Sequence, residues 1–339
     1  MPEGVGILVI LVVFFALAFD YINGFHDTAN AIATVVSTRV LAPRVAILMA
    51  ATLNFVGALI STNVAKTVAA GLVNLSEKEA QGAILAAVIG AIVWNLITWR
   101  WGIPSSSSHA LVGGLCGAAF VYGGFGALKI RGIEEKVILP LVGSPIAGFI
   151  LGFAVMALIF TLLARAHPGR VGATFRRLQL VSAAAMAFSH GSNDAQKSMG
   201  LITLALVSQG LIATHGKDPH IPLWVVLACA TAMGLGTAAG GYRIIKTMGH
   251  RIIRLEPVHG FAAETSAAIV IFLATHFKMP ISTTHTIAGS IFGVGASKRL
   301  SAVRWGVAQS MVIAWILTIP AAGLVAGLVY EGMRLFGVK

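Results

Sequence analysis

One short pattern occurs twice in this chain, as PSSSSH at residues 104–109 and as PISTTH at residues 280–285. Proline suits the first turn of a helix and a hydroxyl suits the residue that caps it, so each stretch predicts a helix start. Two glycines follow each stretch at the same spacing, Gly113 and Gly117 in one copy and Gly289 and Gly293 in the other. The match indicates an internal repeat with equivalent helices in the two halves of the chain.

A second repeated stretch lies before the first one in each half of the chain. Residues 23–30 read NGFHDTAN and residues 190–197 read HGSNDAQK, which places a glycine and an aspartate at the same positions. If each half crosses a membrane five times, an odd number, the second half must be inverted relative to the first. Inverted repeats of this kind are typical of secondary transporters.

The composition places the chain in a lipid bilayer. Hydrophobic residues make up 57% of the sequence, charged residues only 11%, and the mean hydropathy is +0.87, which excludes an ordinary water-soluble domain. Apolar runs that can cross about 30 Å of hydrocarbon as helices lie near residues 5–19, 45–65, 80–99, 137–164, 221–242 and 305–328. We therefore expect an all-α polytopic membrane protein, whose first run is a span and not a cleaved signal peptide.

The lysines and arginines suggest an orientation. Ten crossings that start outside, with residues 102–123 and 280–297 counted as short crossings, place most of the basic loop residues inside. The positive-inside rule then predicts that both termini lie outside the inner, or plasma, membrane. We expect the first repeat at residues 1–165 and the second at residues 181–339.

A basic stretch at residues 166–180 separates the two repeats. It contains Pro168 and Gly169 together with several arginines, which suits a short cytoplasmic connector. An amphipathic helix on the membrane surface, with Phe175, Leu178 and Leu180 facing the lipid, fits the same residues equally well.

Ionisable side chains within or beside the apolar runs are functional candidates, because each one costs several kcal/mol in a bilayer unless it is paired or hydrated. They are Asp20, Asp27, Asp194, Lys197 and Glu264. For Asp20 the structural alternative is a helix end near the interface, and for Glu264 it is a hydrogen bond between helices. For Asp27 and Asp194 the alternative is a cap or a salt bridge, but their equivalent repeat positions favour a function.

The first half offers a cation site. Asp27 and Asn30 lie three residues apart, which places both side chains on one face of a helix. Gly24 before them would let the helix break and expose carbonyl groups. Carboxylate, amide and carbonyl oxygens suit hard cations, so this face predicts a coupling-ion site.

The second half departs from this pattern. Asn193 and Asp194 are its cation-site candidates, but Lys197 stands where the first half has Asn30. A tethered ammonium could occupy the space of a mobile sodium ion, which favours fewer sodium ions, or protons, as the coupling cation. Lys197 could instead contact an anionic substrate directly, or pair with Asp194 or Glu264.

The hydroxyl runs predict an oxyanion site. Their members are Ser105, Ser106, Ser107, Ser108, Ser282, Thr283 and Thr284. A helix start offers free N–H groups and a partial positive charge to an anion, and the hydroxyls add further donors. A single run could be an ordinary helix cap, but inversion brings both copies to mid-membrane.

Other polar residues accompany these motifs. Four histidines lie beside them: His26, His109, His190 and His285. Each could relay protons, or could be a neutral ring that bonds a backbone carbonyl. Asn54, Thr62 and Asn63 could orient either site or could bond neighbouring helices.

These residues resemble the signature segments of a known family, the inorganic phosphate transporters of the Pit type. The resemblance rests on residues 24–30, 188–194 and 280–285 and extends over essentially the whole chain. It implies a secondary active transporter that imports inorganic phosphate by alternating access, with two inverted repeats that each carry a re-entrant helical hairpin. It also implies that the aspartate motifs and the Ser/Thr tips form the ion and phosphate sites.

Two departures from the sodium-coupled members imply symport with protons. Those members carry an Asp-x-x-Asn pattern in both halves, whereas Lys197 makes the second half similar to the proton-coupled bacterial branch. They also tend to carry an acid where Asn54 falls, while Glu264 matches an acid that the family uses. Resemblance to the bacterial branch implies that phosphate travels as a neutral complex with a divalent metal such as Mg²⁺, with Asp27 and Asp194 as metal neighbours.

Other functions compete with this expectation. A sodium-coupled phosphate symporter, or a transporter of another oxyanion such as sulfate, needs the same helix starts; a protonatable neighbour such as Glu264 favours phosphate, which carries a proton near neutral pH. An intramembrane enzyme is disfavoured because the sequence has no HExxH helix and no paired Asp-rich motif. A channel suits an inverted pair less well than a transporter. We expect no cofactor and no nucleic-acid partner, and the sequence leaves a homodimer open.

Overall fold

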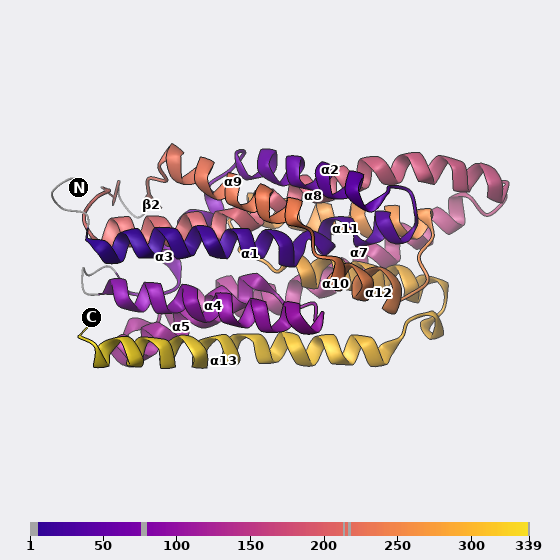
Figure 1. Ribbon diagram of the computed structural model, residues 1–339. Coiled ribbons are helices and arrows are strands. Elements are labelled where there is room, and N and C mark those ends of the chain that lie inside the picture. Colours follow the sequence, from indigo (N-terminus) through magenta and orange to yellow (C-terminus); the bar gives the residue numbers. More distant parts are fainter. Residues whose placement is uncertain (1–5, 76–79, 213, 216–217, 338–339) are drawn as a thin grey trace.

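The computed structural model describes residues 6–75, 80–212, 214–215 and 218–337, and this part of the chain is almost entirely helical (Figure 1). The helices of the first half are α1 (Ile7–Ser37), α2 (Pro43–Ala58), α3 (Asn63–Gly71), α4 (Gln81–Trp101), α5 (Ser107–Gly123), α6 (Ile130–Ile133) and α7 (Leu139–Leu162). Those of the second half are α8 (Pro168–Ser208), α9 (Leu223–Ala239), α10 (Tyr242–Lys246), α11 (Pro257–His276), α12 (Thr283–Lys298) and α13 (Trp305–Leu335). Short 3₁₀ turns cover Gly124–Ala127 and Leu300–Ala302, and π turns cover Glu134–Ile138 and Thr247–Arg251. A small antiparallel pair, β1 (Thr214–His215) with β2 (Asp218–Pro219), was not predicted.

Six helical stretches in the described residues are long and apolar enough to cross a membrane, and eight if two sharply bent pairs each count as one span. The bends are 70° between α2 and α3 and 63° between α9 and α10. The predicted ten crossings exceed this number because α12 has only 16 residues and α8 is interrupted by many polar residues. The chain is therefore a multi-pass helical membrane protein.

Apolar side chains cover the outside of the bundle, whereas four carboxylates lie inside it, those of Asp20, Asp27, Asp194 and Glu264. Leu48, Ile316 and Leu324 are 68%, 66% and 65% exposed, while Asp194 and Glu264 are fully buried. A water-soluble protein shows the reverse arrangement, so this surface suits contact with lipid.

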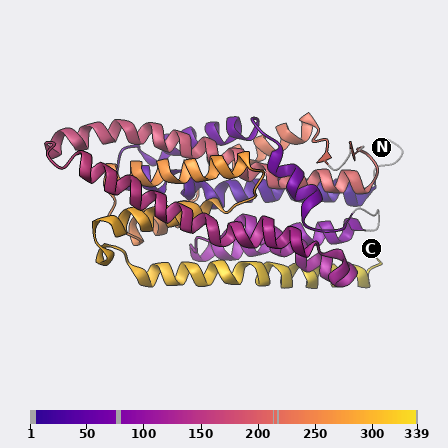
Figure 2. The ribbon, with the colours of Figure 1, turned by 180° about the vertical axis from the view of Figure 1, so that it is seen from behind.

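Two helical hairpins enter the molecule from opposite ends. α4 and α5 pack together in the half that holds both termini, and α11 and α12 pack together in the opposite half (Figure 1). Figure 2 shows the same arrangement from behind. Gly102 and Lys278 occupy the same place in the two turns, and both have left-handed backbone, with φ of 65° and 60°. We call residues 104–108 the first tip and residues 280–284 the second tip.

Helices of the two halves pack against each other in matching pairs. α1 packs against α9 while α8 packs against α2, and α5 packs against α13 while α12 packs against α7. A side chain at Gly24 would meet the backbone of Met233 on α9, and one at Gly191 would meet the backbone of Asn54 on α2. The prediction that the helix breaks at Gly24 is wrong: α1 continues through it, because the missing side chain serves close helix packing instead.

The basic stretch at residues 166–180 leads into the first turns of α8, which project beyond the bundle at the end opposite the termini (Figure 1). Pro168 begins this helix of 41 residues. Phe175 packs edge-on against Phe261 of α11 and is buried, so the prediction that it faces lipid is wrong. Leu178 and Leu180 are partly exposed.

Candidate functional site

Two helix starts meet at the centre of the molecule, where α5 and α12 begin. Ser106 caps α5 by accepting a hydrogen bond from the N–H of His109, and the distance is 3.2 Å. Ser282 caps α12 by accepting one from the N–H of His285, also at 3.2 Å. All the predicted hydroxyl residues are buried there: Ser105, Ser106, Ser107, Ser108, Ser282, Thr283 and Thr284. The two tips touch, because Ser108 Oγ of the first donates a hydrogen bond to the carbonyl oxygen of Ile281 in the second at 3.3 Å.

Asp27 and Asn30 of α1 contact both tips, as their shared helix face predicts. Asp27 Oδ1 accepts a hydrogen bond from Ser107 Oγ of the first tip at 3.3 Å. Asn30 Nδ2 donates to Thr284 Oγ1 of the second tip at 2.8 Å and to Thr283 Oγ1 at 3.4 Å. The first-half motif therefore binds one tip through its carboxylate and the other through its amide.

Asp194 and Lys197 of α8 make the matching contacts from the second half. Asp194 Oδ2 accepts a hydrogen bond from Thr283 Oγ1 at 3.2 Å, and Asp194 Oδ1 pairs with Lys197 Nζ. Lys197 Nζ also donates to Ser108 Oγ at 2.5 Å and to the carbonyl oxygen of Ile281 at 3.0 Å. An ammonium has three N–H donors, so these three acceptors satisfy it completely.

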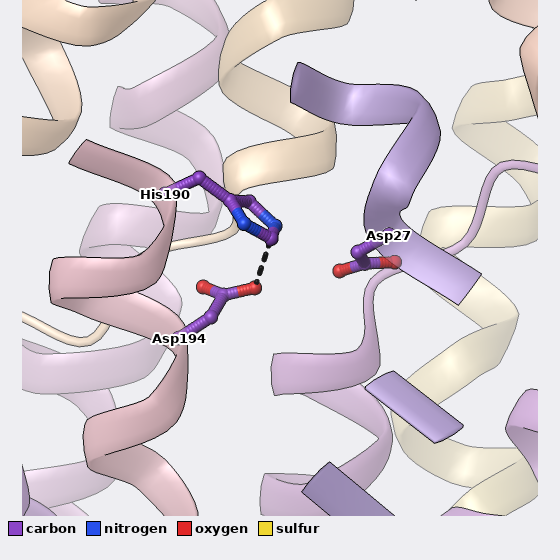
Figure 3. A group of neighbouring side chains, drawn as sticks. All are labelled: Asp27, His190 and Asp194. Carbon is purple, nitrogen blue, oxygen red and sulfur yellow. Dashed lines mark ion pairs between the residues drawn. The ribbon is translucent and has the colours of Figure 1, made fainter. Parts of the chain in front are cut away.

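Asp27, His190 and Asp194 converge from α1 and α8, and we call them the central cluster (Figure 3). One ligand atom from each lies within 4.8 Å of the other two. His190 Nε2 lies 3.3 Å from Asp194 Oδ2, and His190 Nδ1 lies 3.1 Å from Asn54 Oδ1. Two carboxylates this close repel each other unless a cation or a proton compensates them. The arrangement can therefore hold a metal ion or a proton.

The remaining histidines lie near the tips. His26 Nδ1 lies 2.6 Å from the carboxylate of the next residue, and its Nε2 lies 3.1 Å from Thr98 Oγ1. The rings of His109 and His285 stack with centroids 4.8 Å apart, and Trp315 stacks on His285 at 4.0 Å. A proton-relay role stays a prediction for all four histidines.

Glu264 belongs to a separate buried cluster on α11. Its Oε1 accepts hydrogen bonds from Thr34 Oγ1 at 2.5 Å and from Gln179 Nε2 at 3.0 Å, and its Oε2 accepts one from Ser182 Oγ. In the described part of the chain Lys197 pairs with Asp194 and not with Glu264, which leaves the Glu264 carboxylate surrounded by neutral donors. Sequence reasoning missed these three donors, because single hydroxyls and amides in apolar helices look like ordinary helix-to-helix bonds.

Two further contacts of the tips and motifs were not predicted. Thr98 of α4 accepts a hydrogen bond from Ser105 Oγ at 2.9 Å, next to its contact with His26. Gln196 lies within the second motif and accepts a hydrogen bond from the N–H of Val64 at 2.7 Å, which fixes the start of α3 against α8. The position of Gln196 inside a repeated motif was the signal that could have identified it.

The other predicted residues are spread around the site. Asn193 Nδ2 donates to Thr275 Oγ1 of α11 at 2.9 Å, so Asn193 braces the second hairpin. Asn54 borders the central cluster through His190. Thr62 and Asn63 lie at the start of α3, where their described hydrogen bonds are local to that turn.

Asp20 lies inside α1 and is fully buried. The interpretation of this residue as a helix end near the interface is therefore wrong, because α1 continues to Ser37. Its Oδ1 accepts a hydrogen bond from Ser198 Oγ of α8 at 2.7 Å.

The tips close around little free space. A cavity of about 10 Å³ lies between Ser108, His109, Lys197 and Pro280. That volume suffices for about one water molecule and is too small for a tetrahedral oxyanion. The hydrogen bonds to α1 and α8 thus hold the tips in a closed arrangement.

Both the sequence and the fold of the chain are similar to those of known proteins. A profile described as "Phosphate transporter family" matches residues 23–326. The chain is 50% identical over 325 residues to a "Probable low-affinity inorganic phosphate transporter" of Bacillus subtilis (strain 168), covering 96% of each chain. It is 48% identical over 316 residues to a protein of the same name from Rhizobium meliloti (strain 1021), covering 93% of each. A solved structure titled "The sodium-dependent phosphate transporter" matches with a TM-score of 0.86 at 25% identity, covering 97% of this chain and 99% of that one.

Proposed function

The chain belongs to the phosphate transporter family and is not an enzyme, and we propose that it imports inorganic phosphate by symport with protons through alternating access. The observation that carries the proposal is the buried ion pair of Lys197 and Asp194 beneath the tips. A fixed ammonium supplies a positive charge where a mobile cation would otherwise have to bind.

Phosphate would bind between the starts of α5 and α12. Two opposed helix starts place N–H groups and partial positive charge on both sides of an oxyanion. The tip hydroxyls now bond Asp27, Asp194, Asn30 and Lys197, so each of them can exchange a protein partner for a phosphate oxygen. Phosphate therefore competes with the bonds that hold the tips closed.

Proton coupling would follow from this competition. When a phosphate oxygen takes Lys197 away from Asp194, the carboxylate loses its compensating charge in a buried, low-dielectric site. Binding a proton restores neutrality. The proton then accompanies the phosphate, because releasing either alone leaves an uncompensated charge at membrane depth.

A divalent metal could also enter with the phosphate as cargo. Asp27, His190 and Asp194 offer two carboxylates and an imidazole within 4.8 Å, a donor set that suits a transition metal or, through the carboxylates, Mg²⁺. A neutral metal–phosphate complex reduces the charge that has to cross the membrane. We propose this cluster as the contact point for the metal of such a complex.

The matching helix pairs support two inverted repeats with re-entrant hairpins. α1 with α9 corresponds to α8 with α2, and α5 with α13 corresponds to α12 with α7. The two hairpins lie in opposite halves of the molecule (Figure 1). Movement of either hairpin would then open the centre toward one side only. Alternating access would then be an exchange between these two movements.

Glu264 would serve as a second acid of the coupling pathway. Its carboxylate is buried on α11, one arm of the second hairpin, and bonds only neutral donors among the described residues, so a proton can stabilise it without breaking an ion pair. Arginines concentrate in the loops and helix starts at this end of the molecule, including Arg39 in a turn and Arg44 and Arg170 at the starts of α2 and α8. The positive-inside rule supports a cytoplasmic location for this end in the inner membrane, with both termini outside.

Uptake into proteoliposomes tests the proposal directly. Purified protein is reconstituted, and labelled phosphate uptake is measured under an imposed proton gradient, an imposed sodium gradient, or neither, each with and without magnesium. We expect concentrative uptake only with the proton gradient, and a stimulation by magnesium if the metal complex is the cargo. Sulfate in place of phosphate serves as the competing oxyanion.

Sodium coupling is the alternative that a specific observation favours. The solved structure similar to this chain is titled a sodium-dependent phosphate transporter. The first half retains Asp27 and Asn30, whose oxygens suit sodium. Uptake that follows the sodium gradient and ignores the proton gradient would replace proton symport with this alternative.

A further inference from the structure

A fourth buried acid, besides Asp27, Asp194 and Glu264, lies away from the tips and from the Glu264 cluster. Asp20 has an exposed fraction of zero and lies two helical turns before Asp27 on α1, about 10 Å along the helix axis. Its Oδ1 accepts the hydrogen bond from Ser198, and its Oδ2 has no hydrogen-bond partner among the described residues. The thiol of Cys229 on α9 lies beside the carboxyl group.

The packing of the fold does not need a carboxylate here. The register that aligns Asp27 with Asp194 aligns Asp20 with Ala187 and Ser198 with Ala31, and both alanines are fully buried. Gly57 of α2 contacts Phe188 of α8 just as Gly236 of α9 contacts Tyr21 of α1.

These two contacts pair Gly236 of α9 with Gly57 of α2. In the same register Cys229 of α9 corresponds to Ala50 of α2, which is also fully buried. Three alanines therefore fill the equivalent place in the other half, and methyl groups close it without any polar atom. Burial removes the Asp20 carboxyl group from water at a cost in free energy, and the packing does not require a polar group at this position. The carboxyl group therefore indicates a function.

The surroundings of Asp20 suit a proton better than a metal ion. A hard cation requires several oxygen ligands, and the described contacts of Asp20 bring one hydroxyl and one thiol. A proton needs a single acceptor, and Oδ2 is that acceptor.

Asp20 is linked to the ion pair of the second half through α8. Ser198, its hydrogen-bond donor, is the next residue after Lys197, which pairs with Asp194. The Cys229 thiol of α9 is a further titratable group beside Asp20. Helix α4 also packs along α1, and its one charged residue, Arg100, lies near its C-terminal end.

We propose that Asp20 is a proton-binding site of this transporter. It lies between the central cluster and the end of the molecule that holds both termini. Asp20 takes up a proton at Oδ2 and becomes neutral. It then releases the proton toward the central cluster and becomes a carboxylate again. No electron transfer or other reactant is involved. This inference rests on the proposed proton symport and assigns a further residue to it.

Two variants test the site. Asp20→Ala places at this position the residue that the other half uses, and Asp20→Asn keeps the shape without the acid. Glu135→Gln, at an exposed acid paired with Arg131, is the control for loss of a carboxylate. Each protein is reconstituted and assayed for net phosphate uptake under a proton gradient and for exchange of internal against external labelled phosphate without any gradient.

Exchange carries phosphate in and out without net proton movement, so it separates coupling from binding and folding. We expect net uptake by both Asp20 variants to fall at least about tenfold, equivalent to about 1.4 kcal/mol, while exchange stays within about twofold of the parent protein. Glu135→Gln is expected to match the parent in both assays.

Two results would overturn the inference. Unchanged net uptake in both variants would show that Asp20 binds no transported proton, and an equal loss of exchange would show a role in binding or folding. The proposed proton symport fails if net uptake by the parent protein does not respond to the proton gradient. That result is distinct from the two above, and it also removes the role given to Asp20.

Discussion

The first-half site and the second-half site share a frame but differ in charge. Asp27 and Asp194 occupy equivalent positions, and each accepts a hydrogen bond from a tip hydroxyl, Ser107 or Thr283. Three residues later, Asn30 contributes a neutral amide in one half and Lys197 contributes an ammonium in the other. The repeated backbone therefore sets where the tips are held, while the residue three positions after each aspartate sets the charge of its site.

The difference also decides how each site is neutralised. With the tips closed, the carboxylate of Asp194 is compensated by Lys197, with which it forms a buried ion pair. The carboxylate of Asp27 has His26 as its nearest titratable partner, at 2.6 Å. The second half therefore carries a fixed ammonium beside its aspartate, whereas the first half has an imidazole in that role.

The largest expected difference between the halves concerns stability. Asp194→Asn leaves the buried ammonium of Lys197 without a counter-ion, and we expect it to lower the free energy of unfolding by roughly 3–5 kcal/mol. Asp27→Asn removes hydrogen bonds to a charged group but leaves no fixed buried cation, so we expect a loss of roughly 1.5–3 kcal/mol. Chemical denaturation of the purified variants in detergent measures both values.

The double variant Asp194→Asn with Lys197→Met is the control for this difference. Removing both charges should recover much of the stability lost in Asp194→Asn alone, because no unpaired charge remains. Equal losses for Asp27→Asn and Asp194→Asn, with no recovery in the double variant, would contradict the assigned difference in charge.

The smallest expected effect concerns the shared frame, where the halves should behave alike. Ser106→Ala and Ser282→Ala each remove a helix cap with the same 3.2 Å hydrogen bond, and we expect each to cost about 1 kcal/mol. The exposed Ser310→Ala, whose hydroxyl bonds only a carbonyl in its own helix, should cost less. A thermal-denaturation series on the three variants decides whether the two caps are equivalent.

The paired motifs made the centre of the site predictable from sequence. Repeated Pro-Ser/Thr stretches predicted two helix starts, and the structure has both, with the tips touching Asp27 and Asp194. The membrane class followed from composition. Such signals work because they depend on local chemistry that is repeated in the same order.

The missed features depend on packing between distant segments. Gly24 looked like a helix breaker, but its lack of a side chain serves contact with α9, which no local pattern reveals. Phe175 looked like a lipid-facing residue until α11 supplied Phe261 as its partner. Thr98 is a single hydroxyl in an apolar helix, and its importance appears only when the first tip folds back onto it.

The most direct test of the central claim is Lys197→Asn, which gives the second half the same Asp-x-x-Asn pattern as the first. Phosphate uptake into proteoliposomes is measured for this variant and for the parent protein under separate proton and sodium gradients. We predict that the parent responds to protons alone and that the variant gains a sodium-driven component, because a mobile cation can enter the space that the ammonium leaves. If the variant transports phosphate with the same cation dependence as the parent, Lys197 does not replace a coupling cation.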